Sequence, residues 1–396
     1  MSHVAARFLL LLVALNLIVQ GCSESSFNLS NRDKSKAQSQ RLEEAPPVAL
    51  FNGPMPTGVA ISRNGRLFVN FPRWGDDVEY TVAEVKDGKT LPFPDAEINN
   101  FHEGNQSDHL VSVQSVVIDP LDRLWILDTA TINMGPTLSG GPKLLCVDLS
   151  SNKVVRRINF PDNVALSSTY LNDVRFDLNR GPAGTAFITD SGEKSPNGII
   201  VVDLASGQSW RKLDNDPSVK ADDHFTPTVE GEKLMVREPG KPPQPIKMAS
   251  DGIAIDPHKG VLYYCPLGSH RIYSVSLDAL ANRDMPADQV AATIKPLPQR
   301  DFASDGLECT ADGTLLLTDY EHNAIQRLTS DGKYQIVVSD PRMIWPDTMS
   351  IGGNGYLYFT ANQLNRQARF HDGKDLRQKP YVIFRTEIGS RPMAMR

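Results

Sequence analysis

The chain has 396 residues, with 41 basic and 47 acidic side chains and a formal net charge of −6. An acidic balance without a long basic run argues against nucleic acid as a partner, because nucleic-acid binding needs a basic surface. Glycine and proline, 28 of each, favour many short strands joined by tight turns over long helices.

The first segment is typical of an export signal. Arg7 precedes an apolar run over residues 8–19, which is shorter than the roughly 20 residues that span a bilayer and fits a signal sequence. The pair Gly21-Cys22 then resembles the bacterial lipoprotein box, in which the cysteine is acylated. We therefore expect a signal peptide over 1–21 and an exported protein, either secreted or anchored by lipid on the periplasmic or outer-membrane face. An ordinary cleaved secretory signal with an incidental Cys22 is the other interpretation.

Residues 22–47 are polar and poor in aromatics, so they are expected to form a tether, followed by a single folded domain over 48–396. Three cysteines remain in that domain: Cys146, Cys265 and Cys309. An oxidising compartment permits one disulfide among them. Their positions within or beside apparent strands favour three buried free thiols instead, and their spacing is not that of a zinc site.

One unit recurs along the domain. A small or polar pair is followed by a short apolar strand, a turn at Gly, Asp or Asn, and a second apolar strand. Turns such as Asn64-Gly65 and Asp312-Gly313 are typical of β-hairpins. Six copies occupy residues 56–71, 114–129, 172–191, 251–267, 305–320 and 347–362.

The repeat predicts an all-β, single-domain, six-bladed β-propeller, in which each copy is the inner hairpin of a four-stranded blade. A pair of β-sandwiches would not explain one hairpin repeated along the chain. The stretches 48–51 and 381–386 are both strand-like and are expected to share one blade. Residues 76–113 and 204–250 are polar and are expected to form loops over one face. Outer strands are expected at 143–148, 199–203, 271–276 and 324–328.

The repeat also places polar side chains at one mouth of the central channel, because each inner strand starts at the same face. These first residues are Thr57, Gln114, Asn172 with Asp173, Asp251, Asp305 and Asp347. Converging carboxylates with only oxygen ligands suit a hard cation such as Ca²⁺, held by some of the group. The competing interpretation is that Asp and Asn cap strands and turns. Capping is favoured for the residues that end the second strands, namely Asp128, Asp190 and Asp319.

Several long strings resemble the royal-jelly and Yellow protein family. They include DPLDRLWILDTA (119–130), YLNDVRFD (170–177), GVLYYCPLGSHRIYSVS (260–276) and IWPDTMSIGGNGYLYFTANQLNR (344–366). The resemblance runs in order from about residue 47 to the end. It implies a secreted six-bladed propeller. Members of that family include proteins that hold small aromatic amines in the channel and proteins implicated in dopachrome conversion.

A weaker resemblance is to the gluconolactonase and regucalcin propellers, whose metal site uses one Glu, two Asn and one Asp. Asn172 matches one Asn of that site, and Asp251 stands where the second would be. Asp305 matches the Asp that also serves as the base. Thr57 replaces the Glu, which puts the lactonase function in doubt. The resemblance implies Asn172, Asp251 and Asp305 as metal ligands and Asp305 as the catalytic residue.

Three functions therefore remain open, and one of them is a purely structural or partner-binding surface protein. The first is a binding protein that holds a small cationic or aromatic ligand at the channel mouth through Thr57, Gln114, Asn172, Asp173 and Asp347. The second is a metal-dependent lactonase, esterase or isomerase in which Asp305 activates water or takes a proton. Four aromatics are candidates for the walls of the site, although each fits core packing better: Trp74, Trp345, Tyr320 and Phe359.

Overall fold

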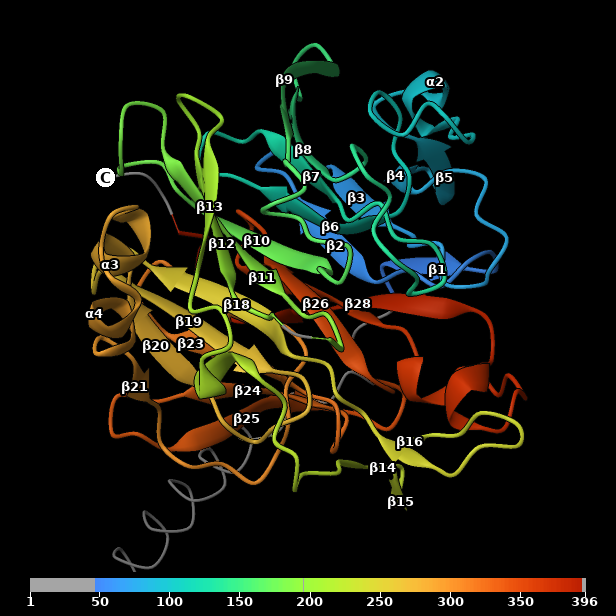
Figure 1. Ribbon diagram of the computed structural model, residues 1–396. Helices are drawn as coiled ribbons and strands as arrows, with labels where there is room; N and C mark the ends of the chain where they lie inside the picture. The colour runs from blue at the N-terminus through green and yellow to red at the C-terminus, as the bar shows by residue number, and fades with distance from the viewer. Residues whose placement is uncertain (1–46, 195, 394–396) are drawn as a thin grey trace, which may run out of the picture.

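Six four-stranded antiparallel sheets are arranged around a common centre, and the innermost strands that carry labels lie near the middle of the view (Figure 1). The computed structural model describes residues 47–194 and 196–393. The predicted signal peptide, Cys22 and all of the tether except its last residue lie outside these residues. The first three blades, from the inner strand outward, are β2 (Gly58–Ile61), β3 (Leu67–Asn70), β4 (Val82–Lys86) and β5 (Lys89–Pro92); β6 (Val113–Ile118), β7 (Leu124–Asp128), β8 (Lys143–Asp148) and β9 (Lys153–Asn159); and β10 (Leu171–Asp177), β11 (Thr185–Asp190), β12 (Ile199–Asp203) and β13 (Ser209–Lys212).

The last blade contains both ends of the domain, as the sequence predicted. Its outermost strand β1 pairs with β28, so that Phe51 lies opposite Tyr381. The remaining blades are β18 (Ser250–Asp256), β19 (Val261–Pro266), β20 (Tyr273–Ser276) and β21 (Lys295–Pro296); β22 (Leu307–Cys309), β23 (Leu315–Asp319), β24 (Ala324–Leu328) and β25 (Tyr334–Ser339); and β26 (Pro346–Ile351), β27 (Tyr356–Ala361), β28 (Tyr381–Glu387) and β1 (Ala49–Phe51). The inner strands contact one another around a closed ring, in which β2 touches β26. Because the last blade combines strands from both ends of the domain and packs against the first blade, the ring closes without an open edge between them.

The expectation for residues 76–113 is wrong in part. That stretch contains β4 and β5, the outer strands of the first blade, joined by Asp87-Gly88, both with positive φ. It also contains the short helix α2 (Ala96–Asn99), which is capped by Asp95. Polar residues on these strands fit an outer hairpin, because its side chains are more exposed than those of inner strands.

The second stretch, 204–250, contributes β13, and its remaining part is hydrogen-bonded to the loops that follow β19, β23 and β27. It contains η2 (Pro217–Val219) and two small hairpins, formed by β14 (Thr228–Val229) with β15 (Glu232–Lys233) and by β16 (Met235–Val236) with β17 (Gln244–Pro245). Its apolar residues Val229, Leu234, Ile246 and Met248 belong to a core cluster with residues of the first and last blades. Two further helices, α3 (Leu277–Ala281) and α4 (Ala287–Ala291), lie between β20 and β21.

The three cysteines of the described domain are buried free thiols, as the strand pattern favoured. In the part of the chain that the structure describes, no helix has the length and apolar character needed to cross a membrane.

A glycine directly after the aspartate that begins an inner-strand repeat lets neighbouring strands approach closely. A Cβ atom on Gly252 would lie 2.2 Å from the carbonyl oxygen of Asp305, and one on Gly306 would lie 2.2 Å from that of Asp347. Real atoms do not approach so closely, so any larger residue would push the inner strands apart. The Asp-Gly pairs of the repeat thus bring the carboxyl-bearing residues of three successive blades together.

Replacing Gly306 by alanine is expected to destabilise the propeller by about 1–3 kcal/mol, because the new methyl group has only backbone to push against. Urea unfolding followed by circular dichroism measures this change. Gly53→Ala is the matched control, since nothing lies within 4 Å of its added Cβ, and its effect should stay within about 0.5 kcal/mol. Equal stabilities for the two variants would contradict the close-approach argument.

Candidate functional site

The polar residues that begin the inner strands are buried at one mouth of the channel. Thr57 immediately precedes β2, and Asp305 lies two residues before β22. The others lie within the strands themselves: Gln114 in β6, Asn172 and Asp173 in β10, Asp251 in β18 and Asp347 in β26. All seven residues are at most 7% exposed. We call this group the acidic mouth.

The three aspartates at the starts of blades four to six interact directly. Burial raises the pKa of Asp305 to about 6, and hydrogen bonds from the Trp345 indole and from Asp251 oppose that rise. Burial, followed by the charges of Asp305 and Asp347, raises the pKa of Asp251 well above its ordinary value. The consistent arrangement is a protonated Asp251 that donates to an Asp305 carboxylate, whose Oδ2 also accepts from Trp345 Nε1 at 2.7 Å.

Asp347 completes the trio. Its Oδ2 accepts from Asn362 Nδ2 at 2.6 Å, and its Oδ1 accepts from Thr348 Oγ1 at 3.1 Å. Burial raises its pKa well above the ordinary value, and the charge of Asp305 adds to the rise. Three carboxyl groups so close together cannot all ionise at neutral pH without a compensating positive charge. The acidic mouth therefore has capacity for a cation.

The negative charge of Asp173, the fourth acid of the mouth, is balanced by a neighbouring arginine. Asp173 Oδ2 accepts from Arg175 Nη1 at 2.8 Å, and its Oδ1 accepts from Ser115 Oγ at 2.6 Å. Both residues are buried within β10. Sequence reasoning missed Arg175, although a basic residue in a strand that is otherwise buried is a signal for a paired charge.

The three uncharged members of the acidic mouth are tied to neighbouring strands. Thr57 Oγ1 accepts from Asn70 Nδ2 at 2.8 Å, and Asn172 Nδ2 donates to Ser191 Oγ at 3.0 Å. Gln114 Oε1 accepts from the Tyr170 hydroxyl at 2.9 Å. The structure thus brings the predicted residues to one mouth. Asp251, Asp305 and Asp347 influence one another's ionisation there, while Asp173 is paired with Arg175.

The aspartates that end the second strands accept hydrogen bonds from backbone N–H groups, in agreement with the capping interpretation. Asp128 accepts from three backbone N–H groups and from Lys143. Asp190 accepts from the backbone N–H groups of residues 170 and 192 and from Arg211. Asp319 binds His322 and Gln326. The carboxylates of these residues are engaged in structural contacts.

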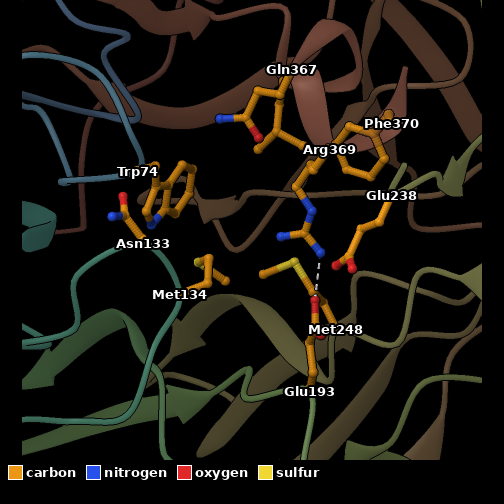
Figure 2. Close-up of a pocket in the computed structure, with 10 residues that line it drawn as sticks. Trp74, Asn133, Met134, Glu193, Glu238, Met248, Gln367, Arg369 and Phe370 are labelled. Atoms are coloured by element: carbon orange, nitrogen blue, oxygen red, sulfur yellow. Dashed lines mark hydrogen bonds and ion pairs between the residues drawn. The ribbon is translucent and has the colours of Figure 1, made fainter. Parts of the chain in front are cut away.

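A pocket of about 350 Å³ opens on the face where the loops after the second strands gather. Figure 2 shows Trp74, Asn133 and Met134 on one side and Gln367, Arg369 and Phe370 on the other. Its remaining lining residues come from other loops: Glu193, Glu238, Met248 and Leu364. Sequence reasoning found Trp74 but not its neighbours, because these loops differ from blade to blade and carry no repeat.

Trp74 connects this pocket to the acidic mouth. Its indole Nε1 donates to the Tyr170 hydroxyl at 2.8 Å, and that hydroxyl donates to Gln114. Tyr170 is buried and close enough to Asp251 and Asp347 for their charges to raise its pKa, in addition to the larger effect of burial. Of the other aromatic candidates, Trp345 and Tyr320 stack on each other at 4.2 Å between ring centroids. Phe359 is fully buried in a core cluster.

Two loops meet across the pocket through an ion pair. Arg369 Nη2 lies 2.6 Å from Glu193 Oε1, drawn as the dashed line in Figure 2. Arg369 belongs to η4 (Ala368–Phe370), which follows η3 (Leu364–Arg366). Both side chains are partly exposed, so the pair contributes at most about 1 kcal/mol and can open.

The acidic mouth offers oxygen atoms that could be ligands for a metal ion. Over residues 47–194 and 196–393, no group of three or more His, Cys, Asp or Glu side chains is arranged to hold a metal ion. Thr57 supplies a hydroxyl where the gluconolactonase site has a carboxylate, and Asp251 is bonded to Asp305. The carboxylate set of the gluconolactonase metal centre is therefore incomplete in this arrangement.

Six blades around a channel with ionisable groups at one mouth define the class of this protein, a six-bladed β-propeller with a polar channel site. Residues 111–388 match the family model described as Major royal jelly protein. The chain belongs to the major royal jelly protein family, which confirms the resemblance seen in the long strings of its sequence.

Curated relatives include Protein yellow of Drosophila melanogaster, which is 27% identical over 252 residues, covering 59% of this chain and 43% of that protein. Major royal jelly protein 3 of Apis mellifera is 28% identical over 205 residues, covering 51% of this chain and 35% of that protein. The match thus spans less than half the length of these relatives.

Solved structures agree with the fold. A luciferin-regenerating enzyme aligns with a TM-score of 0.51 at 13% identity, covering 88% of this chain and 95% of its own. Regucalcin from Agrobacterium tumefaciens, titled a calcium-binding protein, aligns with a TM-score of 0.51 at 13% identity, covering 89% of this chain and 98% of its own. At such low identities the likeness shows the shared propeller fold alone.

Proposed function

We propose that this propeller binds a small cationic aromatic molecule in the pocket above the acidic mouth. The observation that carries the proposal is a hydrogen-bonded link between an aromatic wall and the acidic mouth: Trp74 lines the pocket, and its indole is connected through the Tyr170 hydroxyl to Gln114 of the mouth. The indole and the Phe370 ring offer apolar faces, while Glu193 and Glu238 add negative charge at the rim. An aromatic amine satisfies both halves of such a site.

The positive charge of the ligand is the feature that the site is expected to select. Asp251, Asp305 and Asp347 repel one another when ionised, as the raised pKa values of the buried trio reflect. An ammonium group near the mouth would offset that repulsion, whereas an uncharged ring of the same shape would gain only contact with the apolar wall. Resemblance to family members that hold small aromatic amines supports the same ligand class.

Calorimetric titration of residues 40–396 with tryptamine and with tryptophol tests the proposal, because the two share an indole and differ in charge. Tryptamine should bind at least tenfold more tightly. Trp74→Ala should weaken tryptamine about tenfold through loss of ring contact. Trp210→Ala, on the outer strand β13, is the matched control and should change nothing. Equal affinities for the two indoles would refute the choice of a cation.

A second candidate is the metal-dependent hydrolase or isomerase with Asp305 as its catalytic residue. The specific observation in its favour is the raised pKa of Asp305, about 6, which suits a base at neutral pH. Metal binding by Asn172, Asp251 and Asp305 stays a prediction, since a cation could displace the proton between the two aspartates. Titration of chelator-treated protein with Ca²⁺, Mg²⁺ and Mn²⁺ tests it. One tight ion per chain, lost in Asp305→Ala, would favour the enzyme and justify a screen of lactones and esters.

We also propose that the protein is exported, with Cys22 as a lipid anchor. The apolar run after Arg7 and the Gly21-Cys22 pair support this, together with membership of the family. Mass spectrometry of the mature N-terminus from expressing cells tests it. A diacylated Cys22, absent from Cys22→Ala, is expected. A mature terminus downstream of an unmodified Cys22 would restrict the proposal to simple secretion.

A further inference from the structure

A second cavity, of about 310 Å³, lies at the opposite end of the channel. There the inner hairpins turn, and five of the six turns form its rim through Arg63, Pro120, Asn179, Pro257 and Gly353. The sixth turn, after β22, is covered by the end of the described chain. Ala311 N donates to the carbonyl oxygen of Arg391 at 2.9 Å, and Pro392 forms a bridge with Thr310. We call it the lower cavity and call the pocket that contains Trp74 the upper pocket. The two share no lining residue.

The walls of this lower cavity are largely apolar. They are formed by the channel-facing and turn-proximal side chains of the inner strands, among them Val59, Val117, Phe176, Ile255 and Met349. Val117 is only partly buried, although apolar neighbours surround it. A concave apolar surface of this size is what a small-molecule site offers, and a dissolved apolar molecule would gain free energy by covering it.

The acidic residues at the rim already have partners. Asp119 pairs with Arg123 at 2.7 Å and accepts from the Trp125 indole. Asp177 pairs with Arg180 at 3.2 Å, and Asp122 accepts from the backbone N–H of residue 63 at 2.7 Å. A cationic ligand would have to compete with these contacts, so the rim does not favour a positive charge.

One residue that lines this cavity carries a buried donor without a partner. Arg175 lines the cavity and is 5% exposed. Its Nη1 binds Asp173 and the carbonyl oxygen of Val174, and its Nη2 binds the carbonyl oxygen of Leu307. Within the described chain, its Nε–H has no hydrogen-bond partner. An unpaired buried donor is unfavourable, so a ligand that accepts this hydrogen bond gains both affinity and orientation.

The charge of Arg175 is already balanced, which decides between a neutral acceptor and an anion. Asp173 lies 2.8 Å from one terminal nitrogen, and Glu308 lies 3.5 Å from the other. A carboxylate ligand would add a third negative charge beside these two. A ketone, ester or aldehyde oxygen brings acceptor lone pairs without that repulsion.

We propose that the lower cavity binds an uncharged molecule with an apolar body of one or two rings and a single carbonyl oxygen, which accepts a hydrogen bond from Nε of Arg175. The inference goes beyond the amine pocket, because it concerns the other mouth of the channel and the opposite ligand chemistry. Arg175, between Asp173 above and the apolar walls below, separates the two sites.

The dye prodan, a neutral naphthyl ketone whose fluorescence shifts to shorter wavelength in apolar surroundings, is the probe. Residues 40–396 should bind one prodan per chain with a blue shift. Val117→Phe fills the cavity and should weaken binding at least tenfold, whereas Trp74→Ala, in the upper pocket, should leave it unchanged. Loss of binding in Trp74→Ala, or full binding in a folded Val117→Phe, would overturn the proposal. Tryptamine should not displace the dye, so failure of either site is seen separately.

Displacement of prodan tests the chemistry without any variant. Acetophenone should compete about tenfold better than ethylbenzene, which lacks the oxygen, and better than benzoate, which adds a charge. Equal competition by acetophenone and ethylbenzene would contradict the proposed hydrogen bond from Arg175. Anomalous diffraction from wild-type crystals soaked in para-bromoacetophenone should place bromine between the inner turns, and bromine in the upper pocket alone would contradict the assignment.

Discussion

Lys143→Met is expected to destabilise the propeller by about 3–5 kcal/mol, a larger effect than that of any exposed charge, because it leaves a buried carboxylate uncompensated. Lys143 and Asp128 are both completely buried, with Nζ and Oδ2 2.8 Å apart. The same Nζ donates to the carbonyl oxygens of Gln106 at 2.8 Å and Gly141 at 2.7 Å. Asp128 in turn holds the chain that leads into β6, through Val111 N at 2.7 Å.

Urea unfolding at neutral pH measures this loss. Lys333→Met is the matched control, because Lys333 pairs with Asp331 at 2.8 Å with side chains 75% and 56% exposed. That exposed pair should contribute no more than about 1 kcal/mol. Adding Asp128→Asn to Lys143→Met should recover part of the stability, since the stranded charge is removed. Similar losses for Lys143→Met and Lys333→Met would show that the buried pair is not needed.

The propeller could be predicted because its unit repeats. Inner strands alternate with tight turns six times, and the outer strands Lys143–Asp148, Ile199–Asp203 and Ala324–Leu328 occur where the sequence predicted them. The hairpin of β4 and β5 was missed because many of its residues are polar and largely exposed, so it lacks the apolar pattern of the inner strands. The Asp87-Gly88 pair was a turn signal that could have identified it.

The candidate site divides along the same line. The acidic mouth was predictable, because a hairpin repeat fixes the face on which each inner strand begins. The upper pocket was not, since Met134, Glu193, Glu238 and Phe370 come from loops of unrelated length and sequence. Their convergence depends on how the blades close around the axis, which no local pattern encodes. Trp74 was identified from the sequence as a candidate wall residue, but its hydrogen bond to Tyr170, which connects it to the acidic mouth, was not predicted.

Tryptamine affinity is expected to fall as pH falls below about 6, approaching a tenfold loss per pH unit. The folded chain holds the pKa of Asp305 at about 6, above its ordinary value of 3.8, chiefly through burial. The amine is cationic throughout the range from pH 5 to pH 8, so the change comes from the protein. Above the pKa the carboxylate is available to the ammonium group. Below it, a proton competes for the same oxygen atoms, and binding must release that proton.

Calorimetry at pH 5, 6, 7 and 8 in buffers of different ionisation enthalpy gives both the affinity and the proton release. Proton release should be greatest near and below pH 6 and should vanish at pH 8. Asp305→Asn should flatten the affinity profile, because its amide does not titrate while its oxygen can still accept from Trp345. A wild-type profile that stays flat down to pH 5 would mean that Asp305 does not meet the ligand.

The same variant separates binding from stability. Because the pKa of Asp305 is raised on folding, the unfolded chain releases this proton at lower pH than the folded chain does. Its contribution therefore lowers the free energy of unfolding as pH rises from about 4 to about 6, and that cost persists at pH 8. Asp305→Asn should thus melt at a higher temperature than the wild type at pH 8 while it loses tryptamine affinity. A buried acid that weakens the fold and strengthens ligand binding is what a functional residue, as opposed to a structural cap, would produce.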